Sequence, residues 1–470
     1  MKFYIVGGYL RDLIMGIPSH DIDIAVEGSS YEEMMATDKF VSVGKAFPVF
    51  LHKETNMEFA LCRTETKTGV THKDFSFDTK NVSIIEDLRR RDFTCNALAM
   101  PVEIDLETGK IISDIDISLI LDPFGGIKDI LNKELKIVDP KHFIEDPLRL
   151  IRFCRFLTTL NFTASEETYK ILSSMNNNFG DGKSYFNEFL SFDRINLEIE
   201  KASVSGLNTS IFWKAMLKIG LLKRIFPELY KLSETLECPK YHTELTVFGH
   251  TMKALDMVKD ESPMIKWAVL CHDLYKSVSY AKKREIIINY AIEHNKPYNI
   301  DNYYILLEED DKEFRKYCKD NKIQYHFDHD TKEACDFIES ACRNLRIKSS
   351  WIKFTLGVVK THMKVWNIFE GMKISTFYDL IVPYIRKNLL NDMIKVYIAD
   401  HFGDRAIQDK ADPVKFKEIC SLIEKIVNLN SFSTIIEKFD KSEVSIEKIK
   451  YKMREDSINA IKKEIKLLNF

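Results

Sequence analysis

The sequence predicts an α+β protein, with a small head of strands and helices at the N-terminus and a long all-helical body after it. Two patterns carry this prediction. In the first ~135 residues, short segments rich in β-branched and aromatic residues alternate with glycine-containing turns, which is typical of strands. From residue 145 onward, glycine and proline become rare and apolar residues recur every three or four positions, which is typical of amphipathic helices.

The composition limits the class of protein. A chain of 470 residues with 45% hydrophobic side chains can build a large core, and at ~100–200 residues per domain it corresponds to about three domains. The formal net charge of −3 excludes nucleic-acid binding through bulk positive charge, whereas local basic patches are compatible with it. The nine cysteines form no C-x-x-C pair, so reduced thiols and a cytoplasmic location are predicted. No apolar run reaches the ~20 residues that span a bilayer, so no membrane partner is expected.

In the head, the sequence predicts strands at residues 2–6, 21–27 and 58–63. Between the first two, Gly7 and Gly8 form a turn that opens a helix ending at Gly16. Glycines at this turn let the backbone approach a triphosphate closely, and the start of the helix directs N–H groups toward it. Arg11, one turn into the helix, can add a charge-assisted contact to a phosphate.

The second strand carries two carboxylates, Asp21 and Asp23, at positions i and i+2. On a strand, both side chains project to the same face. Like charges so close repel, so a cation is expected between them. Mg²⁺ prefers oxygen ligands and often bridges carboxylates to substrate phosphates. Two such ions can activate an attacking hydroxyl and stabilise the leaving oxygen of a phosphoryl displacement, which makes Asp21 and Asp23 the predicted catalytic residues.

These features resemble the head of the polymerase-β-like nucleotidyltransferases, and further motifs narrow the family. The segment RRRDFTCNALAM at 89–100 is similar to the RRD-x-x-x-NA motif of class II tRNA nucleotidyltransferases and bacterial poly(A) polymerases. Later motifs of that family resemble the segments at 122–130, 145–156 and 193–201. The resemblance covers the whole chain and implies a polymerase-β-like head with a mixed sheet, followed by a helical neck, body and tail.

The resemblance also implies which residues bind the nucleotide. They are Gly8 and Arg11 at the turn, Arg91 and Asp92 at the ribose, and Asp146, Arg149 and Arg152 in the ED-x-x-R-x-x-R helix. The implied reaction is template-independent addition of CCA to the 3′ end of tRNA from CTP and ATP. In this reaction the 3′-hydroxyl attacks the α-phosphate and pyrophosphate leaves. Residues 63–80 resemble the family's mobile loop, which helps to switch from C to A addition, but they are longer and less glycine-rich.

The residue types at two of these positions explain how a protein can select a base. Asp146 and Arg149, at i and i+3, would lie on one face of a helix. Cytosine and adenine place an amine donor beside a ring-nitrogen acceptor, whereas uracil and guanine place a carbonyl beside an N–H. A carboxylate that only accepts and a guanidinium that only donates therefore fit C and A and reject U and G. The plain alternative is an ordinary ion pair within the helix.

A second set of residues predicts a metal site in the helical body. His250, His272 and Asp273 resemble the H…HD pattern of the HD domain attached to some bacterial tRNA nucleotidyltransferases, which have phosphatase and cyclic-phosphodiesterase activity. Imidazoles and a carboxylate from separate helices suit a divalent ion such as Ni²⁺, Mn²⁺ or Mg²⁺. His242 and His329 also fall where the family places histidines. The resemblance divides the chain into a head at 1–138, a helical neck and RNA- or nucleotide-binding domain at 139–240, an HD domain at 241–390 and a helical tail at 391–470.

Two departures leave the HD site open between an intact centre and a decayed domain that keeps its fold. Tyr275 replaces a glycine of the HD-L-G-K motif, although Lys276 matches its lysine. Met363 follows His362 where an acidic residue would help to close the site. The expected function is therefore CCA addition with an additional HD phosphohydrolase activity. The alternatives are a bacterial-type poly(A) polymerase, an RNA-repair hydrolase that uses the HD site, and a non-catalytic tRNA-binding protein. The sequence leaves the oligomeric state open between monomer and dimer.

Overall fold

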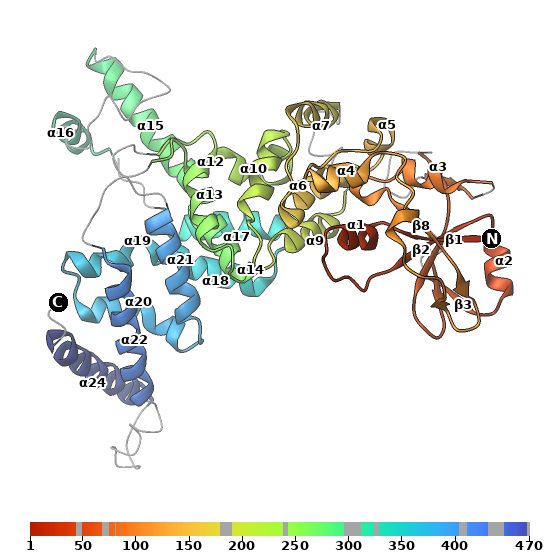
Figure 1. Ribbon diagram of the computed structural model, residues 1–470. Coiled ribbons are helices and arrows are strands. Elements are labelled where there is room, and N and C mark those ends of the chain that lie inside the picture. The colour runs from red at the N-terminus through yellow and green to blue at the C-terminus, as the bar shows by residue number, and fades with distance from the viewer. Residues whose placement is uncertain are drawn as a thin grey trace. The chain divides into compact units, whose positions relative to one another are not determined.

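A computed structural model describes residues 1–43, 49–67, 75–79, 81–178, 190–237, 243–295, 312–323, 329–403, 411–430 and 446–467. The chain forms two compact units. The first consists of Met1–Ala202 with Ile211–Ile225, and the second of Ser203–Ser210 with Phe226–Phe470. The strands lie near the N-terminus and the described elements from α5 onward are helices (Figure 1). The predicted α+β class, with a mixed sheet in the head, is confirmed.

The first unit is built on a six-stranded mixed sheet in the order β3-β4-β5-β2-β1-β8. Its strands are β1 (Lys2–Val6), β2 (Asp23–Glu27), β3 (Phe40–Val43), β4 (Val49–His52), β5 (Glu58–Leu61) and β8 (Ala99–Val102). Strand β2 is parallel to β5, and every other neighbouring pair is antiparallel. Two-stranded sheets join β6 (Thr64–Lys67) to β7 (Phe75–Asp78) and β9 (Ile104–Asp105) to β10 (Lys110–Ile111). The central strands bury apolar side chains such as Ile5, Ile24 and Phe59.

The sheet corrects one strand boundary. The strand expected at 21–27 begins only at Asp23, because Val6, the last residue of β1, pairs with Asp23. Beyond Val6 the chain turns at Gly7, so Asp21 has no residue of β1 opposite it. The argument that Asp21 and Asp23 share one face of a strand is therefore wrong for Asp21, which lies in the loop that leads into β2.

Helices complete the first unit. They are α1 (Gly8–Ile14), α2 (Tyr31–Ala36), α3 (Ile84–Arg89), α4 (Gly126–Leu131), α5 (Pro140–Phe143), α6 (Leu148–Leu160), α7 (Glu166–Asn178), α9 (Phe192–Ala202), α10 (Ser210–Lys218) and α11 (Leu222–Ile225). The turn that opens α1 is as predicted, with Gly7 at φ +77° before the helix and Gly16 at φ +69° after it. The long helices α6 and α9 pack against each other. Their contact places the motif segments at 145–156 and 193–201 side by side.

Every described element of the second unit is helical. Its helices are α12 (Pro227–Leu232), α13 (Val247–Met257), α14 (Pro263–Cys271), α15 (Lys276–Glu293), α16 (Lys312–Asp320), α17 (Lys332–Asn344), α18 (Ser349–Val359), α19 (His362–Val365), α20 (Ile374–Ile385), α21 (Leu390–Gly403), α22 (Pro413–Leu429) and α24 (Ile446–Leu467). Helices α13, α14 and α21 pack on one another around a buried centre, and α18 packs on α14 and α21. The last helix, α24, packs on α20 and α22.

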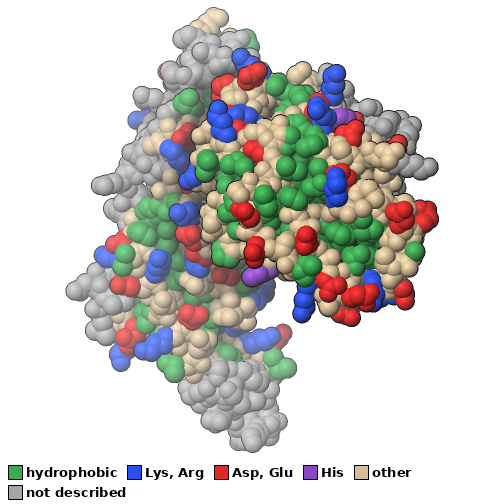
Figure 2. Space-filling view, turned by 45° about the vertical axis from the view of Figure 1, so that its right-hand side comes forward, with side chains coloured by type: hydrophobic (Ala, Val, Ile, Leu, Met, Phe, Trp, Pro, Cys, Tyr) green, Lys and Arg blue, Asp and Glu red, His purple; other side chains and the backbone are tan. Residues whose placement is uncertain are grey.

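The surface matches the nearly balanced charge of the chain. On the face drawn in Figure 2, basic and acidic side chains are interspersed, and hydrophobic side chains form small patches between them. Within the described ranges, no helix combines the length and the low polarity that crossing a membrane requires.

Candidate functional site

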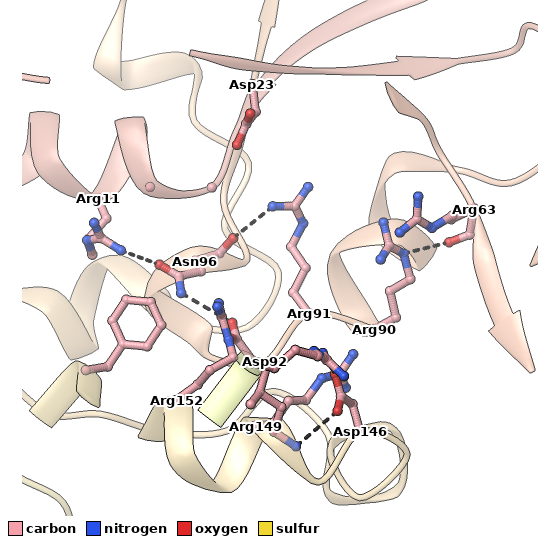
Figure 3. Close-up of a pocket in the computed structure, with 15 residues that line it drawn as sticks. Arg11, Asp23, Arg63, Arg90, Arg91, Asp92, Asn96, Asp146, Arg149 and Arg152 are labelled. Atoms are coloured by element: carbon pink, nitrogen blue, oxygen red, sulfur yellow. Dashed lines mark hydrogen bonds and ion pairs between the residues drawn. The ribbon is translucent and has the colours of Figure 1, made fainter. Parts of the chain in front are cut away.

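An open pocket of about 730 Å³ in the first unit gathers most of the residues that the head and neck motifs contribute (Figure 3). Seven arginines and three aspartates line it: Arg11, Arg63, Arg90, Arg91, Arg149, Arg152, Arg194, Asp23, Asp92 and Asp146. The excess of guanidinium groups makes the pocket a site for a polyanion, because arginine pairs with phosphate through fixed, charge-assisted hydrogen bonds.

The glycine turn forms one wall of this pocket. Gly7 has φ +77°, and a Cβ atom there would lie 3.1 Å from a guanidinium nitrogen of Arg91. Gly8, the first residue of α1, also lines the pocket, with the Arg11 guanidinium close by. A side chain at Gly7 would be strained by its backbone and crowded by Arg91. The turn thus brings bare backbone to the pocket, as the sequence predicted.

The carboxylate of Asp23 points into the pocket from the start of β2 (Figure 3). Although the residue is partly open to solvent, desolvation raises the pKa of Asp23, the negative charge of Asp21 raises it further, and Arg91 opposes both effects. Glu58 lies opposite Asp23 in the parallel pairing of β2 with β5 and adds a third negative charge. Carboxylate oxygens are the donors that Mg²⁺ prefers, and a cation beside Asp23 would relieve this repulsion.

Asn96, which the sequence motifs do not single out as a site residue, is the centre of a hydrogen-bond network. Its side-chain oxygen accepts from Arg11 Nη1 at 2.7 Å, and its backbone carbonyl accepts from Arg91 Nη1 at 3.5 Å (Figure 3). Its amide nitrogen donates to Asp92 Oδ1 at 3.3 Å. Asn96 therefore sets the positions of two pocket arginines that come from α1 and from the RRD segment. The sequence signal for Asn96 is its place as the asparagine of the RRD-x-x-x-NA motif.

Asp92 does not face the pocket as a free carboxylate. It is buried, and its Oδ2 pairs with Arg152 Nε at 2.8 Å and Nη2 at 2.7 Å. Burial alone would raise the pKa of Asp92, but Arg152, together with Arg149 and Asn96, lowers it below its usual value. Asp87, also buried, holds Arg90 and Arg91 in the same way. The acidic residues beneath the pocket thus orient its arginines.

The structure corrects the placement of Asp146. Helix α6 begins at Leu148, so Asp146 lies in the turn before the helix and does not share a helical face with Arg149. Its Oδ2 accepts from Arg194 Nη2 at 2.8 Å, and its Oδ1 accepts from the backbone N–H of Leu148 at 3.0 Å. Arg149 Nη1 donates instead to the carbonyl of His142 at 2.6 Å. The two side chains line the same pocket, each held by a different partner.

The motif at 122–130 supports the RRD segment from behind. A Cβ atom at Gly126 would lie 2.1 Å from the carbonyl oxygen of Thr94, so only glycine permits α4 to pack there. Asp122 caps α4 by accepting from the N–H groups of Gly126 and Ile127, at 2.7 and 3.0 Å. Asp129 accepts from the Thr94 hydroxyl at 2.8 Å. The motif therefore holds the short segment that carries Asp92 and Asn96.

The second unit contains a buried cluster of histidines and aspartates. In one group, His250, His272, Asp273 and Asp400 place their ligand atoms within 4.8 Å of one another. His250 Nε2 lies 3.2 Å and His272 Nε2 3.0 Å from Asp400 Oδ1. Burial opposes charging of His272, but Asp273 and Asp400 outweigh it and raise the pKa of His272 well above its usual value. This donor set fits a divalent transition metal.

A second group shares Asp273 with the first and adds His329 and His362. Their Nε2 atoms lie 3.3 and 3.6 Å from Asp273 Oδ1. Lys276, which matches the lysine of the HD-L-G-K motif, forms ion pairs with Asp273 at 2.8 Å and with Glu237 at 2.9 Å.

The cluster contains an acidic ligand that can take the place of the acidic residue missing at Met363. Asp400 on α21, beyond the boundary predicted for the HD domain at residue 390, supplies the carboxylate that is expected next to His362. Nothing in its surroundings, YIADHF, pointed to a metal ligand. His242 and much of the loop at 63–80 lie outside the described residues.

Comparison with known proteins agrees with these features. Residues 3–136 match the family model described as the poly A polymerase head domain. The chain is 30% identical over 439 residues to a multifunctional CCA protein of Shewanella denitrificans, covering 91% of each chain. It is 34% identical over 290 residues to a multifunctional CCA protein of Mannheimia succiniciproducens, covering 59% of this chain and 64% of that protein.

Solved structures share the fold at lower identity. A Thermotoga maritima CCA-adding enzyme complexed with tRNA superposes with a TM-score of 0.55 at 20% identity, covering 98% of this chain and 87% of the other. A CCA-adding enzyme in complex with ATP gives a TM-score of 0.54 at 18% identity, covering 98% and 86%. These likenesses show the fold.

Proposed function

The chain belongs to the class II CCA-adding enzymes and is a nucleotidyltransferase; on this premise we propose that it builds CCA on the 3′ end of tRNA from CTP and ATP. The observation that carries the proposal is the single pocket in which Asp23, the arginines and Asp146 meet. In this proposal the arginines would bind the triphosphate, Asp146 and Arg149 would face the base, and Asp23 would lie at the reacting phosphate.

The arginines would bind the triphosphate and hold it in line for attack. Arg11 and Arg91, both fixed through Asn96, are supported from behind and keep donors for phosphate oxygens. The glycine turn leaves room for the phosphates beside them. Positioning of this kind contributes much of the catalysis in phosphoryl transfer, because it replaces a bimolecular encounter by a preset geometry.

Family membership implies a divalent metal ion, and we propose Mg²⁺ held by Asp21 and Asp23. When bound, the ion would lower the pKa of the attacking hydroxyl and neutralise charge on the leaving pyrophosphate. The protein's own contribution is the position of Asp23, whose pKa is raised by desolvation and by the negative charges of Asp21 and Glu58. That repulsion is relieved when a cation binds, so cation binding and substrate binding support each other.

Asp146 and Arg149 would read the base by the acceptor and donor pattern of their side chains, although they do not form a helical pair. The contact with Arg194 fixes Asp146 Oδ2, and the carbonyl of His142 fixes one nitrogen of Arg149. Each group keeps further capacity, since a carboxylate has about four acceptor sites and a guanidinium five donors. Arg152, held by Asp92, would contact the base or the phosphates from the next turn of α6.

One assay separates the candidate activities. The protein is incubated with tRNA that lacks its 3′ CCA, together with CTP and ATP, and the products are sequenced. A defined CCA end is expected. A run of A would instead indicate a poly(A) polymerase, and no addition would contradict nucleotidyl transfer altogether.

We also propose a metal-dependent phosphohydrolase activity at the histidine cluster, favoured by the group of His250, His272, Asp273 and Asp400. Its substrates would be phosphate monoesters or 2′,3′-cyclic phosphates at RNA ends. Hydrolysis of 2′,3′-cyclic AMP is expected with Ni²⁺, Mn²⁺ or Mg²⁺ and should be lost in His272→Gln. If no ion supports hydrolysis by the unmodified protein, the cluster is structural.

A further inference from the structure

Helix α16 of the second unit carries a row of four exposed basic side chains, which we call the α16 stripe. Its members are Lys312, Arg315, Lys316 and Lys319. Their spacing of i, i+3, i+4 and i+7 confines them to an arc of ~100° on a helix with about 3.6 residues per turn. The stripe is therefore a continuous line of positive charge on a chain whose formal net charge is −3.

The opposite side of α16 fixes the direction in which the stripe points. Phe314 and Cys318 are buried in a small core with Tyr290 of α15. The ring centroids of Phe314 and Tyr290 are 5.2 Å apart, and those of Tyr317 and Tyr290 are 4.9 Å apart. The Tyr317 hydroxyl donates to Glu293 Oε2 at 2.7 Å. Because these contacts hold α16 against α15, the stripe faces solvent (Figure 1).

The charge of the stripe is not cancelled by the helix that carries it. Within the described residues, Lys312, Lys316 and Lys319 form no ion pair, although Glu313 and Asp320 belong to the same helix. The acidic run at 308–311 precedes the helix in the sequence and lies outside the described residues, so the stripe is defined on α16 alone. These lysines therefore keep their donors for an anionic partner.

The residue types of the stripe favour RNA as that partner. A lysine ammonium is a compact charge that suits contacts with phosphate groups, and such contacts need no particular base sequence. A row of single charges matches a polymer that carries one charge in each monomer. A membrane surface would require apolar side chains on the face that carries the cations. The apolar residues Phe314 and Cys318 of α16 are instead buried against α15.

Helix α15 joins the stripe to the histidine cluster. It begins at Lys276, which pairs with Asp273 of the cluster at 2.8 Å. Helix α16 packs where α15 carries Ile287 and Tyr290. At ~1.5 Å per residue, these two side chains lie roughly 17–21 Å along the helix from Lys276. A strand of a few nucleotides is long enough to cover this distance.

We propose that the α16 stripe binds the phosphates of a single RNA strand whose end enters the histidine cluster. The surface would make an RNA end a better substrate of the cluster than a free nucleotide, because only a strand contacts both places. This inference rests on the proposed phosphohydrolase and deepens it by assigning the surface that binds its substrate.

The salt dependence of RNA binding tests the surface directly. A fluorescent single-stranded RNA with a 3′-hydroxyl end is titrated with the full chain, without nucleoside triphosphates, so that neither proposed reaction can run. Lys312→Gln, Lys316→Gln and Lys319→Gln are combined in one variant, the stripe variant. Each lost phosphate contact reduces the log–log slope by ~0.7, so the slope of the stripe variant should be shallower by ~2. An unchanged slope would overturn the proposal.

A matched variant controls for the loss of three charges. Lys110→Gln, Lys128→Gln and Lys133→Gln remove three exposed lysines of the first unit that do not line its pocket. This control variant should keep the slope of the unmodified chain. An equal change of slope in both variants would mean that net charge matters and the position of the stripe does not, which would also overturn the proposal.

Hydrolysis tests whether the bound strand reaches the cluster. For the same RNA ending in a 2′,3′-cyclic phosphate, the stripe variant should show a KM roughly tenfold higher, because it loses contacts with the strand. For 2′,3′-cyclic AMP, which is too small to contact the stripe, kcat and KM should not change. An unchanged KM for the RNA, or an equal change for both substrates, would contradict delivery to the cluster.

The outcomes separate this inference from its alternatives. If vesicles that contain phosphatidylglycerol bind the unmodified chain but not the stripe variant, and the RNA slope is unchanged, the surface binds membranes and the proposal fails. RNA binding through the stripe without hydrolysis of any cyclic phosphate would overturn the hydrolase and leave the RNA-binding surface standing. Hydrolysis with an unchanged slope would do the reverse.

Discussion

The pocket of the first unit and the cluster of the second are both built around aspartates, but they are built for different cations. In the pocket, Asp23 is partly open to solvent, its neighbours are carboxylates and arginines, and the described lining contains no histidine. In the cluster, four imidazoles join Asp273 and Asp400, and these histidines and Asp273 are buried. Oxygen-only donors suit a hard ion such as Mg²⁺, whereas imidazole nitrogens suit transition metals.

The two sites differ in how they compensate the negative charge of their aspartates. The cluster neutralises Asp273 internally through Lys276, 2.8 Å away, and through the surrounding histidines. In the pocket, Arg91 compensates Asp23 only in part, while Asp21 and Glu58 repel it and Arg152 is paired with Asp92. We therefore expect the pocket to take up its ion together with the nucleotide, and the cluster to hold its metal permanently.

The largest expected effect tests whether the two sites act independently, by removing one metal ligand from each site in turn. Asp23→Ala should lower nucleotide addition by roughly a thousandfold, since a metal ion supplies several kcal/mol and ~1.4 kcal/mol is a factor of ten. Binding of tRNA and hydrolysis of cyclic phosphate should persist. His272→Gln is the reciprocal change and should spare CCA addition. Loss of both activities in either variant would show that the sites are not independent, and retained addition in Asp23→Ala would refute the pocket site.

Base selection belongs to the pocket alone and offers a test of intermediate size. Asp146→Asn keeps the shape but adds a donor, so the amide can flip and donate to the carbonyl of uracil. One base contact is worth ~1–3 kcal/mol, so the preference for CTP over UTP should fall roughly ten- to hundredfold. Steady-state kinetics on tRNA lacking CCA measures the ratio. Asp139→Asn, which caps α5 and does not line the pocket, is the matched control and should keep the preference.

An unchanged ratio in an active Asp146→Asn enzyme would mean that Asp146 serves only as the partner of Arg194. In that case the pocket would select bases through other side chains, and base selection could not be assigned to Asp146.

Removing metal by chelation should lower the melting temperature of the chain through the cluster, because the pocket is expected to bind its ion only together with the nucleotide. A metal present at a hundred times its Kd stabilises the folded state by ~2.7 kcal/mol, which for a unit of this size corresponds to several degrees in Tm. Dialysis against EDTA should therefore lower the melting temperature of the unmodified chain. Re-addition of Mn²⁺ should restore it, and His272→Gln should remove most of the effect. An equally large effect in His272→Gln would place the tightly held metal elsewhere.

The smallest effect concerns the metal-free pocket. Since desolvation and the charge of Asp21 raise the pKa of folded Asp23, this group favours folding when protonated and loses that contribution as the pH rises through the raised pKa. Without Mg²⁺, the contribution of Asp23 to stability should fall slightly as the pH increases from about 4, against the rise that carboxylates with a lowered pKa such as Asp92 give. Asp23→Asn should remove this component, which urea unfolding at several pH values can measure. An identical pH dependence in Asp23→Asn and the unmodified chain would mean that Arg91 compensates the carboxylate fully.

Local sequence patterns determined much of this protein. The glycine turn, strand β1 and helix α1 follow from neighbouring residues, because turn geometry and short-range periodicity act over a few positions. The residue types of the pocket and the cluster were also recognisable, since phosphate binding needs arginine and metal binding needs imidazole and carboxylate.

Only the tertiary structure decided which groups meet. Asp146 was expected on a helix with Arg149, but Pro147 precedes α6 and Arg194, 48 residues away, takes the carboxylate. Asp400 is 128 residues from His272, with nothing around it that indicates a ligand. Asn96 joins two arginines from different elements. Spacing along the chain specifies contacts within one helix or strand, whereas these contacts depend on how helices and strands pack, and packing is set by the whole core.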